Sequence, residues 1–269
     1  MQLSYFLILT ALVLYGLATV VFAAHMMREY KHTARIGMGL LLAGLLAHAA
    51  HALRTGSLDT TGWLAFGIGL IVVIVTLRYP MSALGVFAAP LVFLSFTTAL
   101  FVGVRDSSVH IALKSYWFPL HVSAAIVADA LLAVAGLAAI MYLLQDHFLK
   151  NKQLHGAFHK FPSIHVLDDV SLKLLSVGFL FMTIGMCAGA FLARQYWGTH
   201  WYEDPRQIWS FCTWLILGAM LSARFFTGFR GRRAAFVTVF AVTCIFGGLF
   251  SLNYFNITKH NVTYMELVK

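Results

Sequence analysis

The sequence predicts an all-α integral membrane protein, a single transmembrane domain (residues 1–269) of about eight helices. Of its 269 residues, 60% are hydrophobic and 11% are charged, whereas about 25% of the residues of a soluble domain are charged. The mean hydropathy is +0.81, and the apolar residues form long runs with Lys and Arg at their ends. These observations exclude a soluble globular enzyme and a disordered chain.

Eight apolar segments approach or exceed the length of about 20 residues that a helix needs to cross a bilayer. The first lacks a basic leading segment and is too long for a signal-peptide core, so we expect it to be retained. The third is the shortest. The expected spans are residues 3–27, 36–53, 62–77, 83–104, 117–145, 172–194, 207–224 and 234–252.

The distribution of positive charge predicts the orientation, because Lys and Arg in short loops are preferentially held in the cytoplasm. If the amino terminus lies outside, twelve of the 19 Lys and Arg residues fall inside and seven outside. The cluster Arg230, Arg232 and Arg233 then places the last loop in the cytoplasm. We therefore predict that both termini lie outside. Because the basic residues are scattered over many loops, nucleic acid is not a predicted partner.

The three cysteines and the histidines of the longest inside loop do not indicate a redox or metal site. Cys187, Cys212 and Cys244 lie within apolar segments and form no CxxC or CxxCH motif, so we interpret them as small buried hydrophobic residues. The longest inside loop, residues 146–167, carries four histidines among its lysines. None of their spacings matches a ligand pair such as HExxH, so we interpret this loop as a solvated linker.

The outside loop between the sixth and seventh spans, residues 195–210, holds three Trp and two Tyr. These rings form either an aromatic belt at the membrane surface or a platform for a planar ligand, and the residues alone leave both interpretations open. Arg194 and Arg206 flank the loop and can pair with carboxylates through forked hydrogen bonds. Heme, a planar ring with two propionates, fits both features.

Heme bound at this loop would take axial ligands from the same side of the membrane, and imidazole is the usual protein donor. His121, at the outer end of the fifth span, and His260, after the eighth span, meet this requirement. A single outward His is most simply an interfacial polar residue, but the pair together with the Trp loop favours ligation. His200, inside the loop, is a third candidate that we interpret as a polar edge contact.

The segment from Trp197 to Ser210 resembles the tryptophan-rich WWD signature (WGxxWxWDPKExWS) of the heme-handling proteins that assemble c-type cytochromes. The likeness extends from about residue 117 to the end of the chain, and residues 1–110 are less characteristic. The eight-span layout is most similar to the CcsA (ResC) branch of this family. Further matching segments are Met141–Gln145, Leu167–Asp168, Gly178–Phe179, Thr183–Gly185 with Gly189, and Gly228–Arg233.

The resemblance implies that heme b is held on the outer face, with His121 and His260 as its axial ligands. It implies a CcsB/ResB-type membrane partner and a CxxCH apocytochrome c, whose two thiols receive the heme. It also implies a multi-pass protein of the bacterial inner membrane, or of the thylakoid membrane in a plastid. No catalytic residue is assigned, and whether the complex is a heme lyase stays open. The implied loop residues are Trp197, Gly198, Trp201, Asp204, Pro205 and Trp209.

The sequence departs from the family pattern at two informative positions. Glu203 stands where the family usually has a Trp, and Ser222 stands where it often has a transmembrane His. His48 and His51, three residues apart in the second span, are possible transmembrane substitutes. Asp129 is the only carboxylate deep in a span, and pairing with a His, carrying protons and holding a propionate all remain open for it.

Two alternatives stay open from the sequence. One is a non-catalytic membrane protein of the same fold, similar to the HemX-like or YpjD-like proteins. The other is a diheme cytochrome b subunit of a respiratory complex, which requires paired His on facing helices near both membrane surfaces and which transfers electrons instead of heme.

Overall fold

The computed structural model describes residues 2–27, 32–55, 60–102, 116–152, 160–197 and 205–254, and in these ranges it contains helices and turns but no strand. Seven of the helices described are long and apolar enough to cross a membrane. The expected polytopic helical fold is therefore confirmed. The helices are α1 (Gln2–Met27), α2 (Thr33–Thr55), α3 (Thr60–Arg78), α4 (Leu84–Val102), α6 (Trp117–Lys150), α7 (Ile164–Trp197), α8 (Pro205–Phe226) and α9 (Arg232–Tyr254).

Two of the helices extend beyond their expected spans by five residues or more. α6 continues to Lys150, and α7 begins at Ile164 instead of at residue 172. These extensions carry charged residues, and ion pairs one helical turn apart lie in or next to them: Lys150 with Asp146 at 2.8 Å, and Lys173 with Asp169 at 2.7 Å. Hydropathy identifies only the part of a helix that lies in hydrocarbon, so it missed the parts that project from it.

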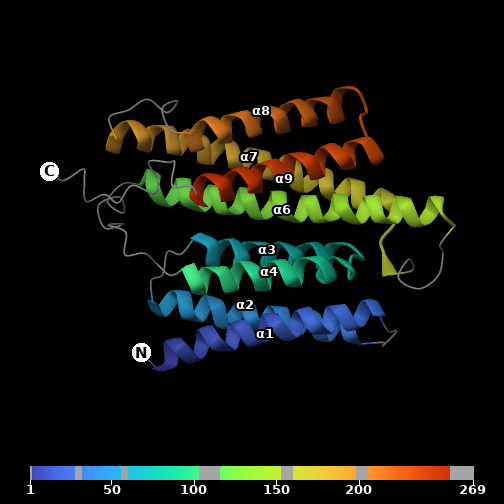
Figure 1. Cartoon of the computed structure of the whole chain (residues 1–269), viewed down its shortest axis with the longest axis horizontal. Coiled ribbons are helices and arrows are strands. Elements are labelled where there is room, and N and C mark those ends of the chain that lie inside the picture. Colours follow the sequence, from blue (N-terminus) through green and yellow to red (C-terminus); the bar gives the residue numbers. More distant parts are fainter. Residues whose placement is uncertain are drawn as a thin grey trace.

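The eight helices form two groups that pack side by side, α1–α4 and α6–α9 (Figure 1). In the second group α6 contacts α7, α7 contacts α8, α8 contacts α9, and α9 contacts α6, which closes a four-helix ring. α6 also packs against α3 and α4, so it is the central helix of the molecule. Half of its buried residues are Ala, and such small side chains let helices approach closely in a membrane.

The start of α1, the end of α9 and the ends of α7 and α8 that border residues 198–204 all lie at the same end of the bundle (Figure 1). We call this the outer end, after the orientation predicted from the charges, and the opposite end the inner end. The side of the membrane that each end faces stays a prediction.

At the inner end, the segment before α7 joins the two groups of helices. The ring of Phe161 lies edge-on between Phe87 of α4 and Phe148 of α6, at centroid distances of 6.1 and 6.0 Å. Lys160 Nζ donates to two carbonyl oxygens at the end of α1, at 2.5 and 3.3 Å. Phe161 is 8% exposed. This part of the loop is therefore packed against the bundle, not solvated as expected from the sequence.

A buried ion pair joins α7 to α8 at the inner end. Arg224 Nη2 donates to Asp168 Oδ1 at 2.5 Å, and Arg224 is only 2% exposed. Removing one partner of such a pair leaves an uncompensated charge in a medium that solvates it poorly, which typically costs ~3–5 kcal/mol.

We expect Asp168→Asn to lower the free energy of unfolding by a few kcal/mol, because Arg224 then loses its counter-charge. The matched control is Asp169→Asn, which removes an exposed pair with Lys173 that is worth about 1 kcal/mol or less. Thermal unfolding of the purified protein in detergent measures both effects. Equal losses in the two variants would show that the buried pair is not the stronger constraint.

The orientation is tested by labelling single cysteines in a variant that lacks the three native ones. Gln195 is exposed at the outer end and Ser163 is exposed at the inner end. A membrane-impermeant maleimide applied to intact cells or spheroplasts is expected to label Gln195→Cys but not Ser163→Cys. The reverse pattern would invert the predicted topology.

Candidate functional site

His121 is held at the outer end of the ring by the backbone of α7. It lies one turn into α6, and its Nδ1 is 2.8 Å from the carbonyl oxygen of Gly185. One turn further along α7, a Cβ on Gly189 would lie 2.8 Å from Cε1 and 2.9 Å from Nδ1 of this imidazole. Any residue larger than Gly at position 189 would therefore collide with the ring. The missing side chain of Gly189 thus lets the imidazole lie directly on the helix backbone, while Gly185 contributes its carbonyl oxygen.

This contact assigns the tautomer of His121. A carbonyl oxygen only accepts hydrogen bonds, so Nδ1 must carry the hydrogen and donate it. In the neutral imidazole the lone pair then resides on Nε2. Histidines that ligate metals usually donate their other ring N–H to a carbonyl or carboxylate, which fixes the orientation of the ring and raises the basicity of the ligating nitrogen.

Trp209 of the Trp-rich loop segment lies in the first turns of α8 and packs on the backbone of α9. A Cβ on Gly248 would overlap Nε1 and Cε2 of its indole, so the ring occupies the space that a side chain would fill. Trp209 is still 36% exposed. The α8–α9 contact thus fixes an indole that keeps part of its surface accessible at the outer end.

The two arginines that flank the Trp-rich loop differ in exposure. Arg206, in the first turn of α8, is half-buried and interacts electrostatically with Asp129 of α6. Asp129 lies two turns below His121, about 12 Å along the helix. Arg194, near the end of α7, is exposed. Pro205 is the first residue of α8, a position at which the missing N–H of proline costs no helical hydrogen bond.

An aromatic stack between α7 and α8, below the Trp-rich loop, was not foreseen from the sequence. Trp214 stacks on Phe179 of α7 at a centroid distance of 5.3 Å and on Phe211 at 6.0 Å. Its Nε1 donates to Thr183 Oγ1 at 2.8 Å. Phe179 and Thr183 belong to the matching segments Gly178–Phe179 and Thr183–Gly185, which were the available signals for this contact.

His48 and His51 lie in the α1–α4 group, outside the four-helix ring of α6–α9. His48 is 5% exposed, its Nδ1 is 3.3 Å from Tyr15 Oη, and the rings of Trp63, Phe66 and Phe96 surround it. His51 Nδ1 is 3.1 Å from Ser4 Oγ on α1. These contacts give both imidazoles partners in helix packing, and a role in binding iron stays a prediction.

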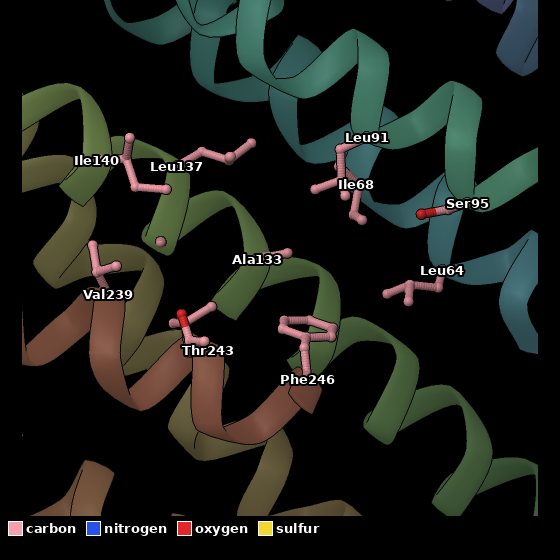
Figure 2. Close-up of a pocket in the computed structure, with 12 residues that line it drawn as sticks. Leu64, Ile68, Leu91, Ser95, Ala133, Leu137, Ile140, Val239, Thr243 and Phe246 are labelled. Carbon is pink, nitrogen blue, oxygen red and sulfur yellow. The ribbon is translucent and has the colours of Figure 1, made fainter. Parts of the chain in front are cut away.

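The part of the chain that the structure describes contains no group of three or more His, Cys, Asp or Glu arranged to hold a metal ion. It does contain an apolar crevice between the two groups of helices, with a volume of about 180 Å³ (Figure 2). Side chains of α3, α4, α6 and α9 line it, with Ser95 and Thr243 as its two hydroxyls. Ligand pockets usually measure ~300–1,000 Å³, so the crevice is too small for a porphyrin.

The residues described at the outer end include one candidate axial donor for heme, His121. Its imidazole donates from Nδ1 to a carbonyl, Trp209 supplies a partly exposed indole, and Arg206 supplies a guanidinium able to meet a carboxylate. The side chain of Trp197 and all of Gly198, Trp201, Asp204 and His260 lie outside the described residues. Their assignments therefore stay predictions.

Comparison with known proteins supplies the family. A family model described as "Cytochrome C assembly protein" matches residues 54–260, which is more than half of the chain. The chain belongs to this family. The resemblance inferred from the Trp-rich loop is thereby confirmed.

Three curated relatives are each named "Cytochrome c biogenesis protein CcsA". The protein of Prochlorococcus marinus (strain MIT 9515) is 28% identical over 222 residues, 74% of this chain and 71% of the relative. The protein of Guillardia theta is 29% identical over 170 residues, 58% of this chain and 56% of the relative. The protein of Chlamydomonas reinhardtii is 32% identical over 156 residues, 54% of this chain and 43% of the relative. The matches thus span about half the length of the two algal relatives.

The packing of Trp209 on α9 is tested with two neighbouring glycines. Gly248→Ala is expected to displace the indole and to destabilise the fold by about 1–3 kcal/mol, because the added methyl group overlaps the ring. Gly247→Ala is the matched control, since its Cβ would meet no atom within 4 Å. Thermal unfolding together with Trp fluorescence measures the difference. Equal behaviour of the two variants would contradict the described contact.

Proposed function

We propose that this membrane protein binds heme b at its outer end and presents it for covalent attachment to a CxxCH apocytochrome c. The proposal rests on one observation above all, the Nδ1–H of His121 donating to Gly185. Membership of the cytochrome c assembly family supports the same function. We further propose His260 as the second axial ligand, on the opposite face of the porphyrin.

The contacts of His121 with α7 suit it as an axial ligand of the heme iron. The carbonyl of Gly185 fixes the tautomer, while the α7 backbone at Gly189 blocks one side of the imidazole. The ring is therefore oriented before any ligand arrives, which reduces the entropy lost on binding. The same carbonyl raises the basicity of Nε2 through the shared proton.

The aromatic residues would supply the platform. Trp209 is fixed by Gly248, and we propose that it works with Trp197 and Trp201, around the turn formed by Gly198, Asp204 and Pro205. Arg206 and Arg194 would meet the two propionates. Because Asp129 and Arg206 interact electrostatically, we propose that Asp129 helps to position the guanidinium.

In this proposal the protein contributes mainly by positioning the heme for reaction with the apocytochrome. Two imidazoles that occupy both axial positions hinder the approach of oxygen to ferrous iron until the acceptor's own His replaces one of them. The outer loop would hold the vinyl groups within reach of the two acceptor thiols, so that thioether formation gains from proximity. We propose a CcsB/ResB-type membrane protein as the partner that delivers the apocytochrome, in the bacterial inner membrane or the thylakoid membrane.

One observation favours a second function within the same fold. Ser222 of α8 is exposed and stands where the family often has a transmembrane His. A HemX-like or YpjD-like protein that binds heme without attaching it would tolerate this change. The diheme cytochrome b alternative is less well supported, because the contacts described for His48 and His51 are to Tyr15 and Ser4.

Replacing His121 tests the proposed function. We expect His121→Gly to reduce covalently bound cytochrome c heme to background, with partial recovery when imidazole is added to the growing cells. Heme staining of membrane proteins after denaturing electrophoresis measures this. The recovery separates lost ligation from lost folding, because free imidazole can occupy the vacated position.

The matched control is His165→Gly, an exposed histidine near the start of α7 at the other end of the bundle. This variant should leave cytochrome c at the wild-type level. Wild-type cytochrome levels in His121→Gly would remove the ligand assignment. If the purified protein retains heme but cannot transfer it to a CxxCH acceptor, even with its partner present, the non-attaching alternative is correct.

A further inference from the structure

A second hollow lies at the inner end, between the last turns of α6 and the first turns of α9. Its volume is about 490 Å³, within the range of ~300–1,000 Å³ typical of ligand pockets. One wall is apolar and the rim is charged. The apolar residues are Ile140, Leu143, Leu144 and Phe236, and the polar residues are Asp146, His147, Lys150 and Arg232.

The charges of the rim are arranged around one carboxylate. Asp146 Oδ2 lies 2.8 Å from Lys150 Nζ and 3.7 Å from Arg232 Nε. Lys150 has three N–H donors and Arg232 has five, so Asp146 engages only part of them. The two cationic side chains are 55% and 56% exposed. The carboxylate therefore holds two cations side by side at the mouth of the hollow, with donors to spare.

The position of the hollow along α6 matches the inner boundary of a bilayer. Trp117 begins α6 at the outer end, and a helix rises about 1.5 Å per residue. Ile140 is then about 35 Å and Asp146 about 44 Å from Trp117. The hydrocarbon core is about 30 Å thick, and the whole bilayer is about 40–45 Å thick. The apolar wall thus begins near the inner edge of the hydrocarbon, and the charged rim lies at the level of the headgroups.

We propose that this hollow binds one anionic phospholipid. Lys150 and Arg232 bind the headgroup phosphate, His147 lies beside it, and an acyl chain runs along Ile140 and Phe236. Basic pockets between transmembrane helices on the cytoplasmic side are typical sites for such headgroups. The cytoplasmic position of the hollow follows from the orientation predicted from the charges, in which the Arg230–Arg233 cluster is cytoplasmic. The proposal does not depend on heme binding.

The apolar wall distinguishes a lipid from a free anion. Inorganic phosphate would contact only the rim and would leave the side chains of Ile140, Leu143, Leu144 and Phe236 without an apolar partner. The guanidinium of Arg232 also lies over the ring of Phe236, 5.4 Å from its centroid, which places headgroup and acyl contacts next to each other. A phospholipid carries a phosphate and acyl chains, so it would contact both the charged rim and the apolar wall.

The test titrates the purified full chain in detergent with dioleoyl phosphatidylglycerol or dioleoyl phosphatidylcholine and counts bound lipids by native mass spectrometry. We expect phosphatidylglycerol to bind more tightly than phosphatidylcholine. The double variant Lys150→Gln/Arg232→Gln should weaken its binding by a factor of about ten or more, since each basic residue near the surface contributes ~1 kcal/mol. Phe236→Ala keeps both charges and should also weaken binding.

The matched control is Arg35→Gln/Arg78→Gln, which removes two exposed cations at the inner end but outside the hollow. It should bind phosphatidylglycerol as the wild type does. Equal losses in the two double variants, or no loss in Lys150→Gln/Arg232→Gln, would overturn the proposal. So would equal affinity for phosphatidylcholine. Displacement of the lipid by glycerophosphoglycerol or inorganic phosphate at equal concentration would identify a free-anion site instead.

Discussion

The close contact of His121 with the glycine-bearing face of α7 is the constraint on which the outer end depends. It requires α6 and α7 to approach so closely that only a glycine at position 189 leaves room for an imidazole between the helices. The many Ala residues on the buried surface of α6 permit the same approach along its length. In hydrocarbon, where apolar surfaces gain little from burial, this close packing is itself a main source of helix association.

The two ends of the ring are built from different interactions. The inner end combines charge with aromatic packing, through the Asp168–Arg224 pair and the ring of Phe161 between α4 and α6. The contacts described toward the outer end are mainly aromatic, as for His121 on α7, Trp209 on α9 and Trp214 on Phe179. The outer end therefore presents aromatic surfaces of the kind that a porphyrin contacts, together with the cations Arg194 and Arg206.

The sequence predicted the polytopic helical fold, because apolar runs of bilayer length have few alternatives. His121 could be named because it stands at the outer end of such a run, and Trp209 because the aromatic loop is so unusual. The glycines against which these residues pack could not be predicted. Gly189 and Gly248 are distant from His121 and Trp209 in the chain, and glycine in a membrane helix has many uses. The Asp168–Arg224 pair was missed because its partners are 56 residues apart and form no local pattern.

The most direct test is an experimental structure of the protein isolated with its bound heme from cells that assemble c-type cytochromes. The account predicts the iron at the outer end, coordinated by Nε2 of His121, while Nδ1 of the same ring still donates to Gly185. Iron coordinated by Nδ1, or by His48 within the α1–α4 group, would contradict it.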